Sequence, residues 1–420
     1  MSNSEGPAPS TAVPRGALAL FARAARQLRS GDGAGALCGF DRLLEDRPEH
    51  PGAALGRGLA LHALGARLTA LEAFRRITAR DRLAWKAWGS IADITPDETE
   101  RTGALAAGAE ALVHLCAGAN PDLLWSAAAA LMDARRPSEA AALLSAARGP
   151  NALPTQLLAR AYYHEGRFSD AFMEACRVLN ETAECREAGA PPSPFNPTAA
   201  RAALIEITDL LVGAGVTPFL ASGTLLGFHR GGGPLAHDRD IDIGILRDPE
   251  GGPDIAGILR AHRALLLPRM ARPGDRYFGL MHRAIAIDIF VYDACAGGLT
   301  CGFSDLAGDI QWRFSRFKLT HASYGDRHWT IPADPDRYLA ETYGPGWQRP
   351  DTGFASVLSS PALYQTDSHA RAYYAVVRAR RARLTGDAAK AAALIHQSPV
   401  PIHGHAGPAG DLPATDPPVT

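Results

Sequence analysis

The sequence of 420 residues has no uninterrupted apolar run of about 18 residues, the length that a membrane-spanning helix requires. Its first residues, MSNSEGPAPSTAVPRG, lack the apolar core of a secretory signal peptide. The formal net charge of −1 provides no general attraction to nucleic acids or to anionic membranes. We therefore expect a cytoplasmic protein that neither spans a membrane nor binds nucleic acid.

Cysteine is scarce and scattered, with six residues and no Cys-x-x-Cys pair. No spacing of Cys and His corresponds to a zinc site, so reduced thiols are the expected state. Apolar residues make up 46% of the chain, an ordinary share for a globular protein. A chain of this length is expected to fold as about two or three domains.

The first part of the chain is rich in Ala and Leu, and it repeats. Five residues recur 34 positions further on: Gly31, Ala36, Leu37, Phe40 and Leu43 return as Gly65, Ala70, Leu71, Phe74 and Ile77. Segments 135–147 and 166–179 fit the same frame, whereas the stretch between about 92 and 120 fits it loosely. The pattern resembles the tetratricopeptide repeat, which predicts antiparallel helix pairs that bury an apolar face on their neighbours.

Composition changes sharply after the repeats. The segment CREAGAPPSPFNPTAA at 185–200 holds four prolines between Pro191 and Pro197, and proline cannot continue a helix. The order that follows is a helix, the strand VTPFLAS, the short helix GTLLGFHR, and the strands IDIGIL and RAIAIDIFVY. This order indicates a compact α/β or α+β sheet domain.

The clearest chemical signal is DRDIDIGI at 238–245. Alternate side chains of a strand share a face, so Asp240 and Asp242 lie together while the isoleucines enter a core. In AIAIDIF the same alternation places Asp288 opposite a buried isoleucine face, beside small alanines that leave room for a ligand. The alternation does not decide whether Asp238, just before the strand, joins that face.

Clustered carboxylates require protons, bases or cations. Hard oxygen ligands suit Mg²⁺ or Mn²⁺, which bridge carboxylates to phosphate oxygens. Upstream, Ser222, Gly223 and Thr224 lie where a strand turns into a helix, and the amides of Gly223 and Thr224 are expected to meet an anion. A Ser-Gly turn into a helix, followed by Asp-x-Asp on the next strand, is typical of nucleotidyltransferases.

The stretch SGTLLGFHRGGGPLAHDRDIDIGI closely resembles the signature of the LicD and fukutin-like phosphotransferases, a branch of the nucleotidyltransferase fold. The segment AIDIF matches a later aspartate of that family, and 324–350 resembles its closing segment, so the resemblance covers about 200–350. It implies that Asp240, Asp242 and Asp288 hold the metal and are catalytic. The substrate-binding residues that it implies are Ser222, Gly223, Thr224, Gly227, Arg230, His237 and Asp238.

One position departs from the family, because Ala236-His237 stands where the family has Pro-Trp, which puts the donor group in doubt. An Asp-x-Asp pair by itself also occurs on surface strands, and Arg230 by itself fits a solvated cation at a helix end. Tyr338, Leu339, Tyr343 and Trp347 are expected to pack a small helix over the sheet rather than to bind substrate.

These observations predict a multidomain protein, with an α-helical tetratricopeptide-like array followed by an α/β (α+β) nucleotidyltransferase-like domain. The expected segments are a disordered start (1–15), helical repeats (16–182), a Pro-rich linker (183–199), a LicD-like catalytic domain (200–360), a helical hairpin (361–397) and a disordered tail (398–420).

The resemblance implies a metal-dependent phosphotransferase. It would move a phosphorylated alcohol, of phosphocholine or alditol-phosphate type, from a cytidine diphosphate-linked donor to a saccharide acceptor in cell-surface glycans. Two alternatives stay open: nucleotidyl transfer to a small molecule or protein, and a non-catalytic interaction protein. Stacked repeats present a groove that can bind a protein partner, although packing on the catalytic domain explains the array equally well.

Overall fold

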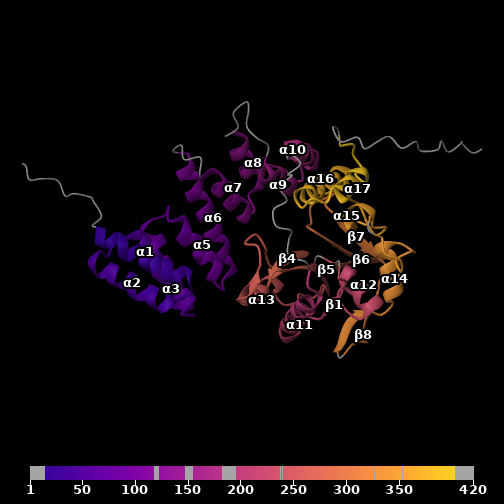
Figure 1. The fold of residues 1–420 in the computed structure, drawn as a ribbon, viewed down its shortest axis with the longest axis horizontal. Helices are drawn as coiled ribbons and strands as arrows, with labels where there is room; N and C mark the ends of the chain where they lie inside the picture. Colours follow the sequence, from indigo (N-terminus) through magenta and orange to yellow (C-terminus); the bar gives the residue numbers. More distant parts are fainter. Residues whose placement is uncertain are drawn as a thin grey trace, which may run out of the picture. The chain divides into compact units, whose positions relative to one another are not determined.

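The computed structural model describes residues 15–117, 123–146, 155–181, 195–236, 238, 240–325, 327–351 and 353–402. The chain divides into two compact units, the first ending at Arg136 and the second beginning at Pro137 (Figure 1). Most of the expected disordered start, of the expected linker and of the expected tail lies outside the described residues, and α1 already begins at Arg15. Each unit is considered by itself below.

The described part of unit 1 is helical throughout. Successive helices pack on each other in pairs, α1 on α2, α3 on α4 and α5 on α6, as predicted for the repeats. The helices are α1 (Arg15–Arg29), α2 (Gly33–Asp46), α3 (Pro51–Ala63), α4 (Arg67–Arg80), α5 (Trp85–Ile94), α6 (Glu98–Cys116) and α7 (Leu124–Asp133).

Five short turns between consecutive helices share one backbone conformation. A residue with positive φ begins each of five such turns: Gly31 (86°), Gly65 (83°), Arg135 (58°), Gly166 (77°) and Gly386 (78°). Five positions after each of them stands an alanine that is at most 2% exposed: Ala36, Ala70, Ala140, Ala171 and Ala391. The left-handed turn favours glycine, and inside each unit the alanine lets the paired helices approach closely. The predicted repeat is confirmed.

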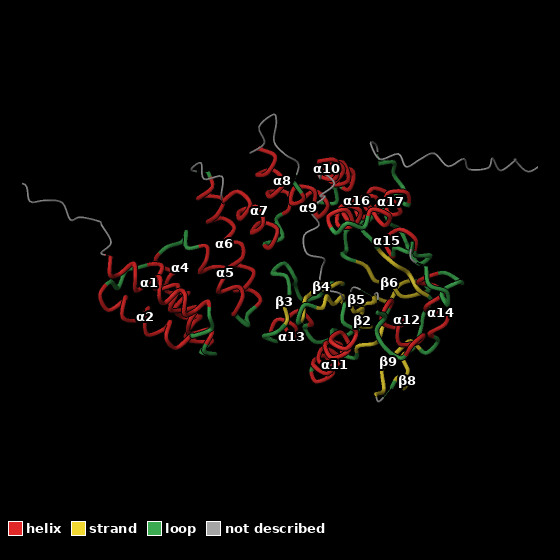
Figure 2. Tube along the Cα trace, viewed as in Figure 1, coloured by secondary structure: helices red, strands yellow, loops and turns green. Residues whose placement is uncertain are grey.

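Two of these hairpins belong to unit 2, and between them the chain forms a sheet domain. Helix α10 packs on α16, and α16 pairs with α17 (Figure 2). Ring centroids of Tyr163 and Tyr373 lie 4.6 Å apart, and those of Phe172 and His369 lie 5.8 Å apart. The helices are α8 (Pro137–Ala146), α9 (Gln156–His164), α10 (Phe168–Glu181), α16 (Ser368–Leu384) and α17 (Ala388–His396). The sheet domain is therefore an insertion between neighbouring hairpins of an array.

Among the described residues, seven strands form one sheet, in which β2 lies between β1 and β5, and β4 and then β3 follow β5. Strands β2 and β5 are parallel, whereas the other pairs are antiparallel. Strands β6 and β7 continue from the end of β5, and β8 pairs with β9 in a separate hairpin. The strands are β1 (Pro218–Leu220), β2 (Asp240–Leu246), β3 (Leu265–Leu266), β4 (Tyr277–His282), β5 (Ile285–Cys295), β6 (Gly298–Gly302), β7 (Gln311–Phe314), β8 (Leu319–Tyr324) and β9 (Arg327–Pro332).

One face of the sheet is buried. Helix α11 contacts β1, β2, β5 and α13. Ile241, Ile243, Ile287 and Ile289 are each at most 1% exposed and belong to this core. The remaining helices are α11 (Pro197–Gly213), α12 (Ser222–Gly231), α13 (Ile255–Ala261), α14 (Pro335–Tyr343) and α15 (Ser356–Ser359). The alternation read from the sequence thus leaves the aspartates on the opposite face.

Helix α9 is joined to the sheet domain by a buried carboxylate. Asp309 is 1% exposed and accepts hydrogen bonds from the hydroxyl groups of Tyr163 and Ser304 and, at 2.6 Å, from the Ile310 amide. Burial raises the pKa of Asp309, and these hydrogen bonds lower it. The division between compact units therefore lies before α8, and not at the Pro-rich segment, where α11 already begins at Pro197. At the other end, Ile402 is buried, beyond the expected start of the tail.

No helix in the described ranges combines the length and the apolar character needed to cross a bilayer.

Replacing Tyr163 by Phe should lower the free energy of unfolding of unit 2 by about 1–3 kcal/mol, because buried Asp309 loses a donor. The matched control is Tyr162→Phe on the same helix, which removes only an exposed contact with Ser145. That variant should change stability by less than about 0.5 kcal/mol. Urea denaturation of residues 137–420 measures both, and equal stability of the two variants would contradict the assigned role of the Tyr163–Asp309 bond.

Candidate active site

Three aspartates share one face of the two parallel strands. The register of β2 and β5 places Asp242 directly opposite Asp288, and Asp240 opposite Ala286. All three aspartates are half-buried, and the isoleucines between them point into the core on the other face. The shared face of the aspartates agrees with the strand alternation in the sequence. The structure also shows that β2 and β5 are direct neighbours.

The first turn of α12 is tied to β2 by reciprocal hydrogen bonds. The Gly223 amide donates to Asp242 Oδ2 at 2.8 Å, and the Asp242 amide donates to Thr224 Oγ1 at 2.7 Å. A Cβ atom on Gly223 would stand 3.0 Å from Asp242 Oδ2 and 3.3 Å from Asp238 Oδ2. The sequence predicts that the Gly223 amide meets an anion, and in the structure it donates to the carboxylate of Asp242. Asp238 lies close to Gly223 as well.

Ser222 takes a strained backbone conformation where β1 ends and α12 begins. Its φ of 36° lies in the left-handed region, which a residue with a side chain adopts at a cost of about 1–3 kcal/mol. The Ser222 amide donates to the Tyr338 hydroxyl at 3.3 Å, and that hydroxyl is 2.7 Å from the Tyr292 hydroxyl. Buried Tyr338 thus packs as expected and also supports the strained turn.

Strand β4 adds a residue that the sequence does not single out. The Tyr277 hydroxyl donates to Asp288 Oδ1 at 2.7 Å, and Gly279 pairs with Asp288 in the antiparallel register. The bond fixes one carboxylate oxygen of Asp288. On α14, burial raises the pKa of Tyr343, and the charges of Asp242, Asp238 and Asp240 raise it further, so this ring also lies near the acids.

The acids strongly disfavour one another's ionised forms. The pKa of Asp242 is raised well above its usual value by burial and then by the charges of Asp240, Asp288 and Asp238, while the Gly223 hydrogen bond lowers it. Burial and the charge of Asp240 raise the pKa of Asp288 to about 7, although the Tyr277 hydrogen bond and the positive charge of Arg378 lower it. Asp288 can therefore take up a proton near neutral pH.

The donor chemistry of the site fits a hard divalent cation. Asp242 and Asp288 supply carboxylates from adjacent strands, and their mutual repulsion is the condition that a cation relieves. In the described part of the chain, no group of three or more His, Cys, Asp or Glu side chains is already arranged as a ligand cluster. One oxygen of each carboxylate accepts a hydrogen bond, Asp242 Oδ2 from the Gly223 amide and Asp288 Oδ1 from the Tyr277 hydroxyl, so the other oxygen could ligate a cation.

The other residues of the expected substrate-binding set lie elsewhere. A Cβ atom on Gly227 would stand 2.6 Å from the Gly233 carbonyl oxygen, so Gly227 lets the loop before Asp238 pass close to α12. Arg230 lies about 10 Å along the helix from Gly223, and its guanidinium donates to the Trp347 carbonyl. The structure therefore does not bring Arg230 to the acids. His237 lies outside the described residues.

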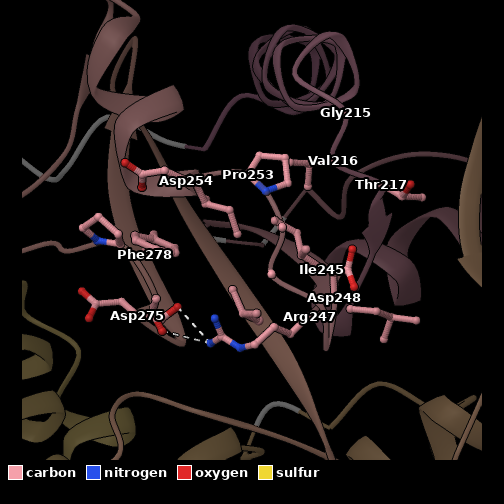
Figure 3. Close-up of a pocket in the computed structure, with 17 residues that line it drawn as sticks. Gly215, Val216, Thr217, Ile245, Arg247, Asp248, Pro253, Asp254, Asp275 and Phe278 are labelled. Carbon is pink, nitrogen blue, oxygen red and sulfur yellow. Dashed lines mark hydrogen bonds between the residues drawn. The ribbon is translucent and has the colours of Figure 1, made fainter. Parts of the chain in front are cut away.

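A cavity of about 430 Å³ lies at the other end of β2 (Figure 3). Its lining includes Arg247, Asp248 and Asp275, and the Arg247 guanidinium donates to the carbonyl oxygens of Gly274 and Asp275 at 3.0 and 3.4 Å. The strand from Asp242 to Leu246 spans about 13 Å. This cavity is therefore separate from the three aspartates, and the Arg247 guanidinium that lines it already donates hydrogen bonds to the backbone.

In metal-free protein, the free energy of unfolding of unit 2 should fall as pH rises from about 4 through about 7. The pKa of Asp288 is raised from 3.8 to about 7 in the folded state, so folding favours the protonated form and stability is lost as that form disappears. Asp288→Asn should flatten this dependence, since an amide oxygen can still accept the Tyr277 bond. Urea denaturation in EDTA at pH 5 and pH 8 tests it, and an unchanged slope in the variant would exclude Asp288 as the cause.

One family model matches part of the chain. Residues 215–254 match the family model described as LicD/FKTN/FKRP, nucleotidyltransferase domain. No curated protein matches the chain.

Three solved structures are similar to the helical part. A thermophilic TPR protein of Thermus thermophilus is 19% identical, with a TM-score of 0.28, over 40% of this chain and 91% of that one. The MamA protein is 16% identical, with a TM-score of 0.30, over 42% and 98%. A structure of Naa15/Naa10 bound to HypK-THB is 16% identical, with a TM-score of 0.31, over 47% and 29%.

Scores this low do not establish a fold, whereas the recurring turn glycines and buried alanines are features of this chain itself. The family match in turn covers the strained turn, α12 and the Asp-x-Asp strand. The chain therefore carries a LicD-type nucleotidyltransferase domain, preceded by tetratricopeptide-like helical repeats.

Proposed function

We propose that this protein is a metal-dependent phosphotransferase. It moves a phosphorylated alcohol, of phosphocholine or alditol-phosphate type, from a cytidine diphosphate-linked donor to a saccharide acceptor of a cell-surface glycan. The observation that carries the proposal is the parallel register of β2 and β5, which gathers Asp240, Asp242 and Asp288 beside the strained start of α12. The match of residues 215–254 to the LicD/FKTN/FKRP model supports the reaction class.

In this proposal Asp240 and Asp242 hold Mg²⁺ or Mn²⁺, with Asp288 as a further ligand or as the base. The bound cation supplies charge neutralisation at the diphosphate of the donor. Gly223 and the first turn of α12 lie next to Asp242, and a phosphate oxygen can replace the Asp242 carboxylate as the acceptor of the Gly223 amide. The strained turn therefore orients one hydrogen-bond donor, the Gly223 amide, towards the acid face.

The transfer itself forms one bond and breaks one bond. The acceptor hydroxyl oxygen bonds to the phosphorus that carries the alcohol, and the bond from that phosphorus to the oxygen of cytidine monophosphate breaks. The hydroxyl proton passes to the carboxylate of Asp288, which stands directly opposite Asp242 on the neighbouring strand. Tyr277 keeps one Asp288 oxygen bonded, so the carboxyl group stays oriented while it takes up the proton.

Asp242→Asn should lower kcat by about a hundredfold to a thousandfold, because a charged group is lost where charge develops. The amide oxygen of Asn can still accept the Gly223 bond, so the fold should be kept, with an equal or higher melting temperature in EDTA. The matched control is Asp248→Asn, an exposed residue after the far end of β2, which should leave the rate unchanged.

A screen with CDP-choline and CDP-alditol donors follows both products, the transferred phospho-alcohol and the transferred nucleotide. Full activity of Asp242→Asn at saturating Mg²⁺ would refute the assignment. Transfer of the nucleotide would instead establish nucleotidyl transfer, and the absence of any transfer by the wild type would favour an interaction protein.

We further propose that unit 1 recruits the acceptor or a protein that carries it. Stacked helix pairs present a groove of the kind that binds peptides and proteins, and unit 1 is compact separately from the unit that holds the acids. Residues 137–420 expressed alone should therefore hydrolyse the donor at the rate of the full chain but transfer to the physiological acceptor at least about tenfold more slowly, a loss of about 1.4 kcal/mol of binding. Equal transfer by the fragment and the full chain would contradict recruitment.

A further inference from the structure

The hairpin α16–α17 brings a cation to the acid face. Arg378 lies one helical turn after Tyr374 on α16. The centroids of the Tyr374 and Phe303 rings are 5.3 Å apart, and those of Phe303 and Tyr277 are 5.0 Å apart. Because the Tyr277 hydroxyl bonds to Asp288, a continuous row of aromatic rings joins this helix to the acids.

The charge of Arg378 acts on those acids. Burial lowers the pKa of Arg378, while Tyr374, Asp240, Asp288 and Tyr277 raise it. In the opposite direction, the positive charge of Arg378 lowers the pKa of Asp288. Both shifts describe one charge interaction, and together with the row of rings from Tyr374 to Tyr277 it places the guanidinium within electrostatic reach of the acids.

The Arg378 guanidinium is half-buried, and it makes neither a hydrogen bond nor an ion pair with any residue that the structure describes. No Arg378 nitrogen is among the fully buried side-chain atoms that lack a partner in the described part of the chain, so its N–H groups stay accessible to an anionic ligand. Its five N–H groups form a planar fork that matches the oxygens of a phosphate. If the carboxylates hold a divalent cation, the Arg378 guanidinium stays available to bind a different anion.

We propose that Arg378 is a donor-binding residue that contacts the diphosphate group of the donor. The proposal rests on the proposed function, because it assigns the phosphate partner of the same site. The diphosphate is then held from two sides, by the cation at the aspartates and by the guanidinium on α16. A hairpin of the helical array thus completes the active site, from a segment outside residues 215–254.

The experiment measures binding of CDP in the presence of Mg²⁺ to the full chain by isothermal titration calorimetry. Arg378→Gln should weaken CDP binding about 10- to 100-fold, because a charge-assisted contact is lost. Arg378→Lys should weaken it about 3- to 10-fold, since a point charge replaces a planar fork. The matched control is Arg381→Gln, an exposed arginine of the same helix, which should stay within about twofold of the wild type.

Mg²⁺ binding without nucleotide separates the proposal from a simple counter-charge. If Arg378 only offsets the acids, Arg378→Gln binds Mg²⁺ more tightly and binds CDP as the wild type does, and the proposal is wrong. If Arg378→Gln does not fold, Arg378→Lys decides the matter, and wild-type CDP affinity in that variant overturns it. Failure of the wild type and of Arg381→Gln to bind CDP would instead refute the proposed function.

Discussion

The like-charge pair of Asp242 and Asp288 is the constraint on which the rest of the site depends. Two carboxylates about 5 Å apart repel by roughly 3 kcal/mol at an effective dielectric constant of about 20. The pair persists because the register is fixed on the other face of the sheet, where Ile243 and Ile289 are fully buried. A slip by one residue would expose those isoleucines. Burial of the isoleucines therefore keeps the two carboxylates adjacent despite their repulsion.

Each acid is balanced from a different element of the fold. The α12 amide of Gly223 bonds to Asp242, the β4 hydroxyl of Tyr277 bonds to Asp288, and the charge of Arg378 on α16 acts on both Asp240 and Asp288. None of these groups neutralises a full negative charge by itself. The site therefore keeps a net attraction for cations while its carboxylates stay oriented.

Part of this site can be predicted from sequence, because it depends on local periodicity. The alternation of isoleucine and aspartate predicts the face of Asp240, Asp242 and Asp288, and turn glycines with buried alanines predict the helix pairs. Tyr277 does not follow from such a pattern, since its strand is short and its importance lies in pairing with β5. Arg378 depends on the packing of α16 against α10, and the position of Arg230 depends on the Trp347 carbonyl. Contacts between segments far apart in sequence leave no periodic signal.

The sequence predicts a helical hairpin at 361–397, but it does not indicate that this hairpin packs on α10. That placement has a consequence for how the chain is assembled. Because α10 and α16 pack as successive helices of one array, a chain that joined Glu181 directly to Ser368 would present an uninterrupted set of repeats. The sheet domain thus lies between two helices that pack on each other, and buried Asp309 bonds it to Tyr163 of α9 as well. These contacts favour a fixed position of the acids relative to the helices of unit 2.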